Sequence, residues 1–230
     1  MLRQSNRDFF VRCSGQGPAL WSIGFIFLAT LSAFAQTTSD PWLTLASGEK
    51  GSINARMTRQ DLVRIYGAPN VIDQDVDTGE GETELGTVVF PKDSERSIEI
   101  LWQDPERKTL PASAQIEGAK SLWKTVHNIS LGTSLRDLER LNGRPFKLAG
   151  FGWDYSGTVT SWENGALAAE LDGGHGRVIL RLDSSTPQAA DKDVAQVVGD
   201  RDFSSHHPVM QKLNPTAYQI IWVFGSPTQN

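Results

Sequence analysis

The acidic residues with the most suggestive spacing lie in the segment DQDVDTGEGETE, residues 73–84. Its first, third, fifth and twelfth positions, from which a calcium-binding loop supplies oxygen ligands, are Asp73, Asp75, Asp77 and Glu84. Thr78 stands at the sixth position, where such loops need Gly, and Pro69 prevents a helix from leading into the segment. We therefore weigh calcium binding against a solvated acidic hairpin loop.

Aromatic residues gather in the segment FGWDYSGTVTSW, which contains Phe151, Trp153, Tyr155 and Trp162. Because Trp and Tyr are enriched at the energetic centres of protein interfaces, these four residues are candidates for a partner-binding surface. The alternative is that they fill the core of a domain that has no disulfide bonds. Trp102 and Trp222 lie in apolar strand-like runs, and we expect them in the core.

Histidines offer a second possible chemistry, because His206 and His207 are adjacent. Neighbouring side chains of an extended chain point to opposite sides, so this pair is poorly arranged for one metal ion, and we favour an exposed turn. The other histidines, His127 and His175, stand alone. The chain contains no Gly-x-Ser-x-Gly or His-Glu-x-x-His motif and no phosphate-binding Gly loop. A hydrolase with an unrecognised site stays an alternative.

Two segments 76 residues apart predict the same short helix. INARMTRQDLVRIYGAP, residues 53–69, and ISLGTSLRDLERLNGRP, residues 129–145, are identical at six of 17 aligned positions. In each, a hydroxyl residue followed three places later by Asp favours a helix start, and Gly-x-Pro ends the helix. The residues of this structural motif are Thr58, Asp61, Gly67, Pro69, Ser134, Asp137, Gly143 and Pro145. Helices this short need other elements to pack against.

Strand-like segments follow each helix. We predict strands at residues 87–90, 97–102, 113–117, 146–150, 158–162, 166–171, 177–182 and 218–224. Asn164-Gly165 is typical of a two-residue hairpin turn. In the segment 177–182, Arg177, Ile179 and Arg181 alternate with apolar residues, which predicts a strand with one buried face and one largely solvent-exposed face. Residues 183–216 are polar and interrupted by Pro, and we interpret them as a long connection.

The N-terminal 35 residues have the pattern of a signal peptide. Three Arg precede an apolar run that ends in Ala33-Phe34-Ala35, a small-x-small cleavage pattern. Cleavage there removes Cys13, the single cysteine, which excludes a disulfide framework and a cysteine nucleophile from the mature chain. It also changes the formal net charge from −5 to −7, which argues against nucleic acid or an anionic membrane surface as a partner.

The repeated helix, its Gly-x-Pro end and the strands that follow resemble the SmpA/OmlA-type outer-membrane assembly lipoproteins and the β-lactamase-inhibitor-like exported proteins. MTRQDLVRIYGAP and GTSLRDLERLNGRP carry the resemblance. It implies a two-repeat α+β fold whose sheet faces bind other proteins, and it does not imply catalysis. The lipidated Cys of the lipoproteins has no counterpart after residue 35, so we expect no lipid anchor.

We therefore expect an exported α+β protein, periplasmic or secreted, with two tandem repeats of a capped helix and an antiparallel meander. The expected divisions are a signal peptide (1–35), a tether containing Trp42 (36–52), repeat 1 (53–127) and repeat 2 (128–230). The expected function is non-catalytic binding of an envelope protein, with no cofactor, no membrane span and no nucleic acid. The alternatives are a calcium- or small-ligand-binding protein and a hydrolase.

Overall fold

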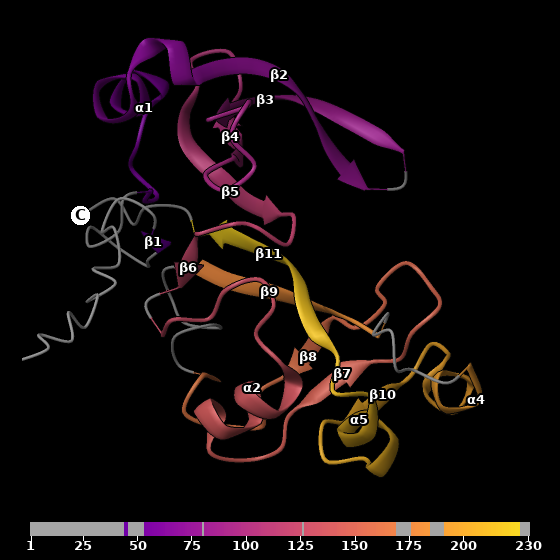
Figure 1. Cartoon of the computed structure of the whole chain (residues 1–230). Coiled ribbons are helices and arrows are strands. Elements are labelled where there is room, and N and C mark those ends of the chain that lie inside the picture. Colours follow the sequence, from indigo (N-terminus) through magenta and orange to yellow (C-terminus); the bar gives the residue numbers. More distant parts are fainter. Residues whose placement is uncertain are drawn as a thin grey trace, which may run out of the picture. The chain divides into compact units, whose positions relative to one another are not determined.

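The computed structural model describes residues 44–45, 53–79, 81–125, 127–168, 176–184 and 191–225 (Figure 1). The chain divides into two compact units, residues 1–38 and 39–230, and every described residue belongs to the second. The predicted signal peptide, Trp42 in the predicted tether, and His175 lie outside the described residues. Within the described ranges, no helix is both long enough and apolar enough to cross a bilayer.

The fold is α+β, and its strands pair mostly antiparallel. The helices are α1 (Arg59–Tyr66), α2 (Leu135–Asn142), α4 (Asp191–Val194) and α5 (Pro208–Leu213), with 3-10 turns η3 (Ala68–Asn70) and η4 (Ala195–Val197). The largest sheet has the order β2 (Val71–Gly79), β3 (Glu82–Val89), β4 (Ile98–Asp104), β5 (Thr109–Glu117), β11 (Thr216–Phe224) and β9 (Gly176–Asp183). A three-stranded sheet has the order β10 (Asp202–Ser204), β7 (Lys147–Ala149) and β8 (Val159–Ser161). A parallel pair joins β1 (Thr44–Leu45) and β6 (Lys124–Thr125).

Both predicted helices form, with the predicted residues at their ends. Thr58 Oγ1 accepts a hydrogen bond from the backbone N–H of Asp61, and the Asp61 carboxylate accepts one from the backbone N–H of Thr58 at 2.9 Å. This reciprocal pair satisfies two backbone donors that the first turn of a helix leaves without partners. At α2, Ser134 Oγ accepts a hydrogen bond from the backbone N–H of Asp137 and donates one to the Asp137 carboxylate, and Gly143 ends the helix in the left-handed conformation at φ 72°.

Each helix start is bound to the start of a strand by the same pair of backbone bonds. At α1, the C=O of Met57 accepts from the N–H of Leu110, and the N–H of Arg59 donates to the C=O of Lys108. The corresponding bonds at α2 join Thr133 to Ala217 and Leu135 to Pro215. These contacts place α1 against β5 and α2 against β11, which are neighbours in the central sheet.

One face of the six-stranded sheet forms the core. Its side chains include Ile98, Ile100, Trp102, Ala114, Ile116, Ile220, Trp222, Leu180 and Val178, each no more than 5 % exposed. Leu62 of α1 and Leu135 and Leu138 of α2 are fully buried and belong to the same cluster. The prediction that Trp102 and Trp222 lie in the core is confirmed.

The last strand joins the two halves of the chain. β11 pairs with β9, and on its other side it pairs with β5, with Ile220 opposite Ile116 and Trp222 opposite Ala114. The strand predicted at residues 218–224 forms as part of β11. Figure 1 shows β5, β11 and β9 running side by side. The pairing with β5 therefore merges strands from both halves into one sheet.

The predicted strand at residues 166–171 is wrong for the part that is described, because residues 166 and 167 form a turn and residue 168 is helical. The side chain and backbone of Asn142 bind this turn: Asn142 Oδ1 accepts from Leu167 N–H and Asn142 C=O accepts from Ala166 N–H. These amides are thereby removed from strand pairing. We predict the two-residue turn at Asn164-Gly165. The residues with positive φ are instead Glu163 and Asn164, so the turn lies one position earlier.

The interpretation of residues 183–216 as a long connection is also wrong in its described part. This segment contains α4, η4, β10 and α5. Val197, Phe203, Met210 and Leu213 are each no more than 7 % exposed and join the main core. Because these apolar residues are widely spaced among polar ones, the sequence pattern does not reveal them as one buried set.

Candidate functional site

The acidic segment at residues 73–84 is a β-hairpin rather than an ion-binding loop. Asp73, Asp75 and Asp77 lie on β2, and Glu84 lies on β3 opposite Val76. An extended strand rises about 3.3 Å per residue, so Asp73 and Asp77 are about 13 Å apart. They cannot both bind one calcium ion at 2.3–2.6 Å. The segment has the hairpin geometry that we weigh against calcium binding, and calcium binding stays a prediction that this arrangement does not support. Within the described ranges, no group of three or more His, Cys, Asp or Glu residues could hold a metal ion.

Asp73 instead binds other elements of the fold. Its carboxylate accepts from Arg59 Nε at 2.8 Å and from Thr87 Oγ1 at 2.9 Å, and lies 3.5 Å from Lys108 Nζ. Burial opposes ionisation of this carboxyl group, but the hydrogen bonds from Arg59 and Thr87 and the two cations outweigh it and hold its pKa below the ordinary value. Asp73 thus links α1 to the hairpin.

The aromatic segment at residues 151–162 is divided between core and surface. Phe151 and Trp162 are each 3 % exposed, so the prediction that they contact a partner is wrong for both. Trp153 is partly exposed and its Nε1 donates to Gly150 C=O at 2.9 Å. Tyr155 is 54 % exposed, and its ring meets that of Trp153 edge to face at 5.4 Å. Of the four residues, Trp153 and Tyr155 keep a surface that a partner can reach.

Tyr155 lies at a cleft where two sheet edges diverge. β8 and β9 touch at Thr158 and Arg181, where Leu182 N–H donates to Gly157 C=O at 3.0 Å. Beyond this point they enclose a cavity of about 360 Å³. We call it the β8/β9 cleft; its lining residues are Tyr155, Thr158, Val159, Thr160, Arg177, Val178, Ile179 and Arg181.

The β8/β9 cleft carries uncompensated positive charge. Neither Arg177 nor Arg181 forms an ion pair with any residue in the described ranges. Arg181 Nε and Thr158 Oγ1 are buried and have no hydrogen-bond partner among the described residues. Buried polar groups are normally paired, so these two atoms mark a place where a polar ligand would gain hydrogen bonds.

The cleft continues into the second face of the six-stranded sheet. The strand register places three rows of side chains across this face, which we call the outward face: Leu101–Ser113–Val223–Arg177, Glu99–Gln115–Ile221–Ile179 and Glu117–Gln219–Arg181. Its four aliphatic side chains are all partly exposed. Ile221 and Val223 of β11 therefore lie in the middle of this surface, with Leu101 and Ile179 at its two sides. Acidic residues occupy the β4 and β5 side, and arginines occupy the β9 side.

Sequence reasoning predicted only part of the outward face. The alternation of Arg177, Ile179 and Arg181 with buried residues is confirmed by the burial of Val178 and Leu180. In β11 the continuous apolar run YQIIWVF conceals which side chains face outward. The signal that could have found them is the register with β5, and sequence alone does not provide it.

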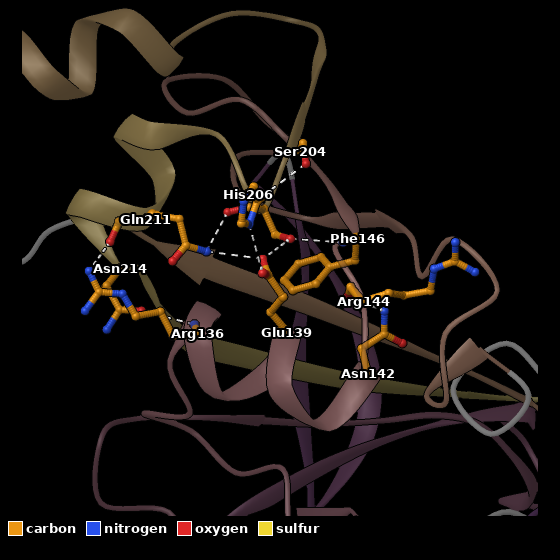
Figure 2. Close-up of polar contacts among 10 residues, drawn as sticks. Arg136, Glu139, Asn142, Arg144, Phe146, Ser204, His206, Gln211 and Asn214 are labelled. Atoms are coloured by element: carbon orange, nitrogen blue, oxygen red, sulfur yellow. Dashed lines mark hydrogen bonds and ion pairs between the residues drawn. The ribbon is translucent and has the colours of Figure 1, made fainter.

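A second polar cluster surrounds Glu139 on α2 (Figure 2). The Glu139 carboxylate accepts from Ser205 Oγ at 2.7 Å and from Gln211 Nε2 at 3.1 Å, and lies 3.2 Å from His206 Nδ1. A shallow pocket of about 490 Å³ adjoins it. The pocket is lined by Glu139, His206, Gln211, Gly143, Pro145, Arg136, Arg140 and Arg144.

The cluster around Glu139 does not assemble a nucleophile with a base. Ser205 is fully buried, and its Oγ donates to Glu139 rather than meeting the His206 ring. His207 points elsewhere, where its Nδ1 accepts from Val209 N–H and caps α5. The pocket's described lining contains no Ser, Thr or Cys. The cluster can hold α2, β10 and α5 together, and a hydrolase stays a prediction that these contacts do not support.

No family model matches this chain, and neither the curated proteins nor the solved structures contain a significant match to it. The function is therefore inferred from the geometry of the described residues and from the pattern of the sequence.

Proposed function

We propose that this chain is an exported, non-catalytic protein-binding module of the cell envelope, and that its partner docks on the outward face of the six-stranded sheet. The leader pattern in residues 1–35 supports export. The observation that carries the docking site is the presence of four partly exposed aliphatic side chains on that face: Ile221 and Val223 at its centre, Leu101 on the β4 side and Ile179 on the β9 side.

The arrangement of the outward face fits a protein interface. A one-sided antiparallel sheet usually presents polar side chains to water, whereas this face places aliphatic residues at its centre. Interfaces combine an apolar centre with a polar rim. Here Gln115 Nε2 donates to Glu99 at 2.7 Å and Gln219 donates to Glu117, so the acidic side of the rim is held in fixed positions. Complementary charge on a partner would set its orientation.

We also propose that the chain consists of two copies of one unit, each with a capped helix bound to a strand of the central sheet. The 76-residue offset between α1 and α2 supports this, as do the matched backbone bonds at both helix starts. In this arrangement β5 and β11 are corresponding strands that meet at the centre of the sheet. The outward face then lies across the junction of the two copies.

The docking face can be tested with two matched variants. An affinity-tagged chain recovered from envelope extract is expected to carry a stoichiometric partner. Ile221→Glu places a charge at the apolar centre and is expected to remove that partner. Leu122→Glu is the control, because Leu122 is 52 % exposed and lies outside the outward face. Circular dichroism verifies that both variants are folded. Absence of a stoichiometric partner, or retention of it by Ile221→Glu, rejects the proposal.

A further inference from the structure

We infer that the β8/β9 cleft is a binding site for a small aliphatic dicarboxylate, a ligand with two carboxylate groups joined by a short apolar chain. This site goes beyond the proposed function, because it binds a small molecule through the side chains of the cleft and needs no partner protein. Three properties of the cleft support it: its charge, the unpartnered polar atoms at the end where β8 meets β9, and the apolar side chains between its two arginines.

The cleft concentrates positive charge. Its described lining includes Arg177 and Arg181 and contains no Asp or Glu. Neither arginine forms an ion pair with any residue in the described part of the chain. The whole chain has a formal net charge of −5, so this positive charge is local. A cleft lined by charge of one sign raises the local concentration of ions of the other sign. The cleft therefore favours an anionic ligand.

Two polar atoms lie at the joined end of the cleft, where β8 meets β9. Thr158 and Arg181 form the bridge between these strands, so their side chains are direct neighbours. Thr158 Oγ1 and Arg181 Nε are both buried, and neither has a hydrogen-bond partner among the described residues. A carboxylate at this point would accept a hydrogen bond from each of them. Hydrogen bonds between arginine and a carboxylate are among the stronger ones in proteins.

Gln219 does not take the place of such a ligand. It lies opposite Arg181 on β11, and its side-chain oxygen is an acceptor that Arg181 Nε could bind. Instead, Gln219 Oε1 is itself buried without a partner among the described residues, while Gln219 Nε2 donates to Glu117. Arg181 is thus not engaged by this neighbour, and its side chain lines the cleft.

Apolar side chains lie between the two arginines. Val178 and Ile179 separate them on β9, and Val159 adds to the lining from β8. Val159 and Ile179 are partly exposed, so a methylene chain in the cleft would remove apolar surface from water. Small-molecule sites combine apolar walls with a few polar groups that fix the orientation of the ligand. A methylene chain with an anionic group at each end matches this lining.

The two arginines have different roles in the proposed site. Arg181 is partly buried and, with Thr158 beside it, holds one carboxylate at the joined end. Arg177 is exposed and holds the second carboxylate at the far end; its Cα lies about 13 Å from that of Arg181 along β9. The cavity of about 360 Å³ is near the lower limit for small-molecule sites, which restricts the ligand to a short chain.

Isothermal titration calorimetry of the purified protein tests the site. The probes are succinate, glutarate, adipate and pimelate, each compared with the monocarboxylate of the same chain length. One dicarboxylate is expected to bind about tenfold tighter than its matched monocarboxylate, because a second hydrogen bond between charged groups contributes a factor of this order. The difference is expected to shrink at high salt. Absence of binding by every dicarboxylate, or equal binding within every pair, overturns the inference.

Matched variants assign the binding to the cleft, with the dicarboxylate that binds best as the probe. Arg177→Gln is expected to lower its affinity about tenfold and to leave that of the matched monocarboxylate unchanged. Arg181→Gln is expected to weaken both ligands about tenfold, because Arg181 holds the carboxylate that they share. Arg107→Gln is the control, because the Arg107 side chain is 83 % exposed in the turn after β4. Circular dichroism verifies that the variants are folded. Unchanged affinity in both cleft variants, or an equal loss in Arg107→Gln, overturns the inference.

The two proposals fail independently. If no dicarboxylate binds while Ile221→Glu still removes the captured partner, the docking face stands and the dicarboxylate site is rejected. If a dicarboxylate binds as expected while no partner is captured, the dicarboxylate site stands and the docking face is rejected.

Discussion

Single buried polar residues hold together segments that have no regular pairing. Asn142 is 1 % exposed; its Nδ2 donates to the C=O groups of Arg144 and Trp162 at 3.0 Å, and its Oδ1 accepts from Leu167 N–H. Gly165 lies against it, because a Cβ there would approach Asn142 Oδ1 to 2.1 Å. This one side chain fixes the end of α2 against the turn that follows β8.

Asn142→Ala is therefore expected to lower the free energy of unfolding by about 2–4 kcal/mol, because it leaves buried backbone groups without partners. Chemical denaturation measures this loss. Leu141→Ala, at the adjacent 41 %-exposed position of the same helix, is the control and is expected to cost less than about 1 kcal/mol. Similar losses in both variants would contradict the role assigned to Asn142.

Asp61 gives the helix cap a dependence on pH. Hydrogen bonds from the Thr58 side chain and backbone, helped by Arg64, hold the pKa of Asp61 below its ordinary value of 3.8. A carboxyl group whose pKa is lowered by folding stabilises the protein above its unfolded-state pKa. That stabilisation is lost as the pH falls through the lower folded-state value.

Asp61→Ala is accordingly expected to cost about 1 kcal/mol at pH 7, and the difference from the unchanged protein is expected to shrink as the pH falls below about 3.8. Denaturation curves measured between pH 7 and pH 2 test this. Glu106→Ala, at an exposed carboxylate in the turn after β4, is expected to change stability little at any pH. A pH-independent cost of Asp61→Ala would show that the charge does not contribute.

At the scale of elements, local and distant contacts differ in how well the sequence predicts them. The caps of α1 and α2 depend on residues three positions apart, so Thr58 and Ser134 could be identified directly. The pairing of β11 with β5 joins residues about 100 positions apart, such as Gln219 and Glu117, and no local pattern specifies that register.

The candidate site depends on the same distant contacts. The sequence assigns Arg177 and Arg181 to a solvent-exposed strand face. It does not predict the β8/β9 cleft, because the cleft forms where β8 pairs with β7 while β9 pairs with β11. The aromatic segment shows the same limit. Its composition is equally compatible with a place in the core and a place on the surface. Only the folded structure shows that Phe151 and Trp162 pack into the main core.

Gly157 fixes the point at which β8 and β9 meet. A Cβ at this residue would lie 1.9 Å from Leu182 C=O, and its φ is 66°. Gly157→Ala is expected to cost about 3 kcal/mol or more, because it adds a steric clash to the strain of a left-handed conformation. Gly132→Ala is the matched control: its φ is 86°, but its Cβ would meet open space, so only about 1–2 kcal/mol is expected. Equal costs would show that the β8–β9 contact is not tight.

At the scale of the whole described unit, the two faces of the central sheet differ: one belongs to the core, and the other is the face that we propose for docking. The core face is closed by the helices and by the apolar residues of the segment between β9 and β11. The outward face joins residues of β4, β5, β11 and β9, so neither half of the chain builds it alone. A partner on this face would contact both halves and would stabilise their association through linkage.

Photo-crosslinking at Val223 in cells that export the protein tests this account most directly. A benzoylphenylalanine residue at Val223 lies at the centre of the outward face, and one at Leu122 is the control on a 52 %-exposed position outside it. A discrete adduct with one envelope protein is expected at Val223 and not at Leu122, and it is expected to disappear when Ile221→Glu is added. No adduct at Val223, or the same adduct at both positions, would contradict the proposed docking face.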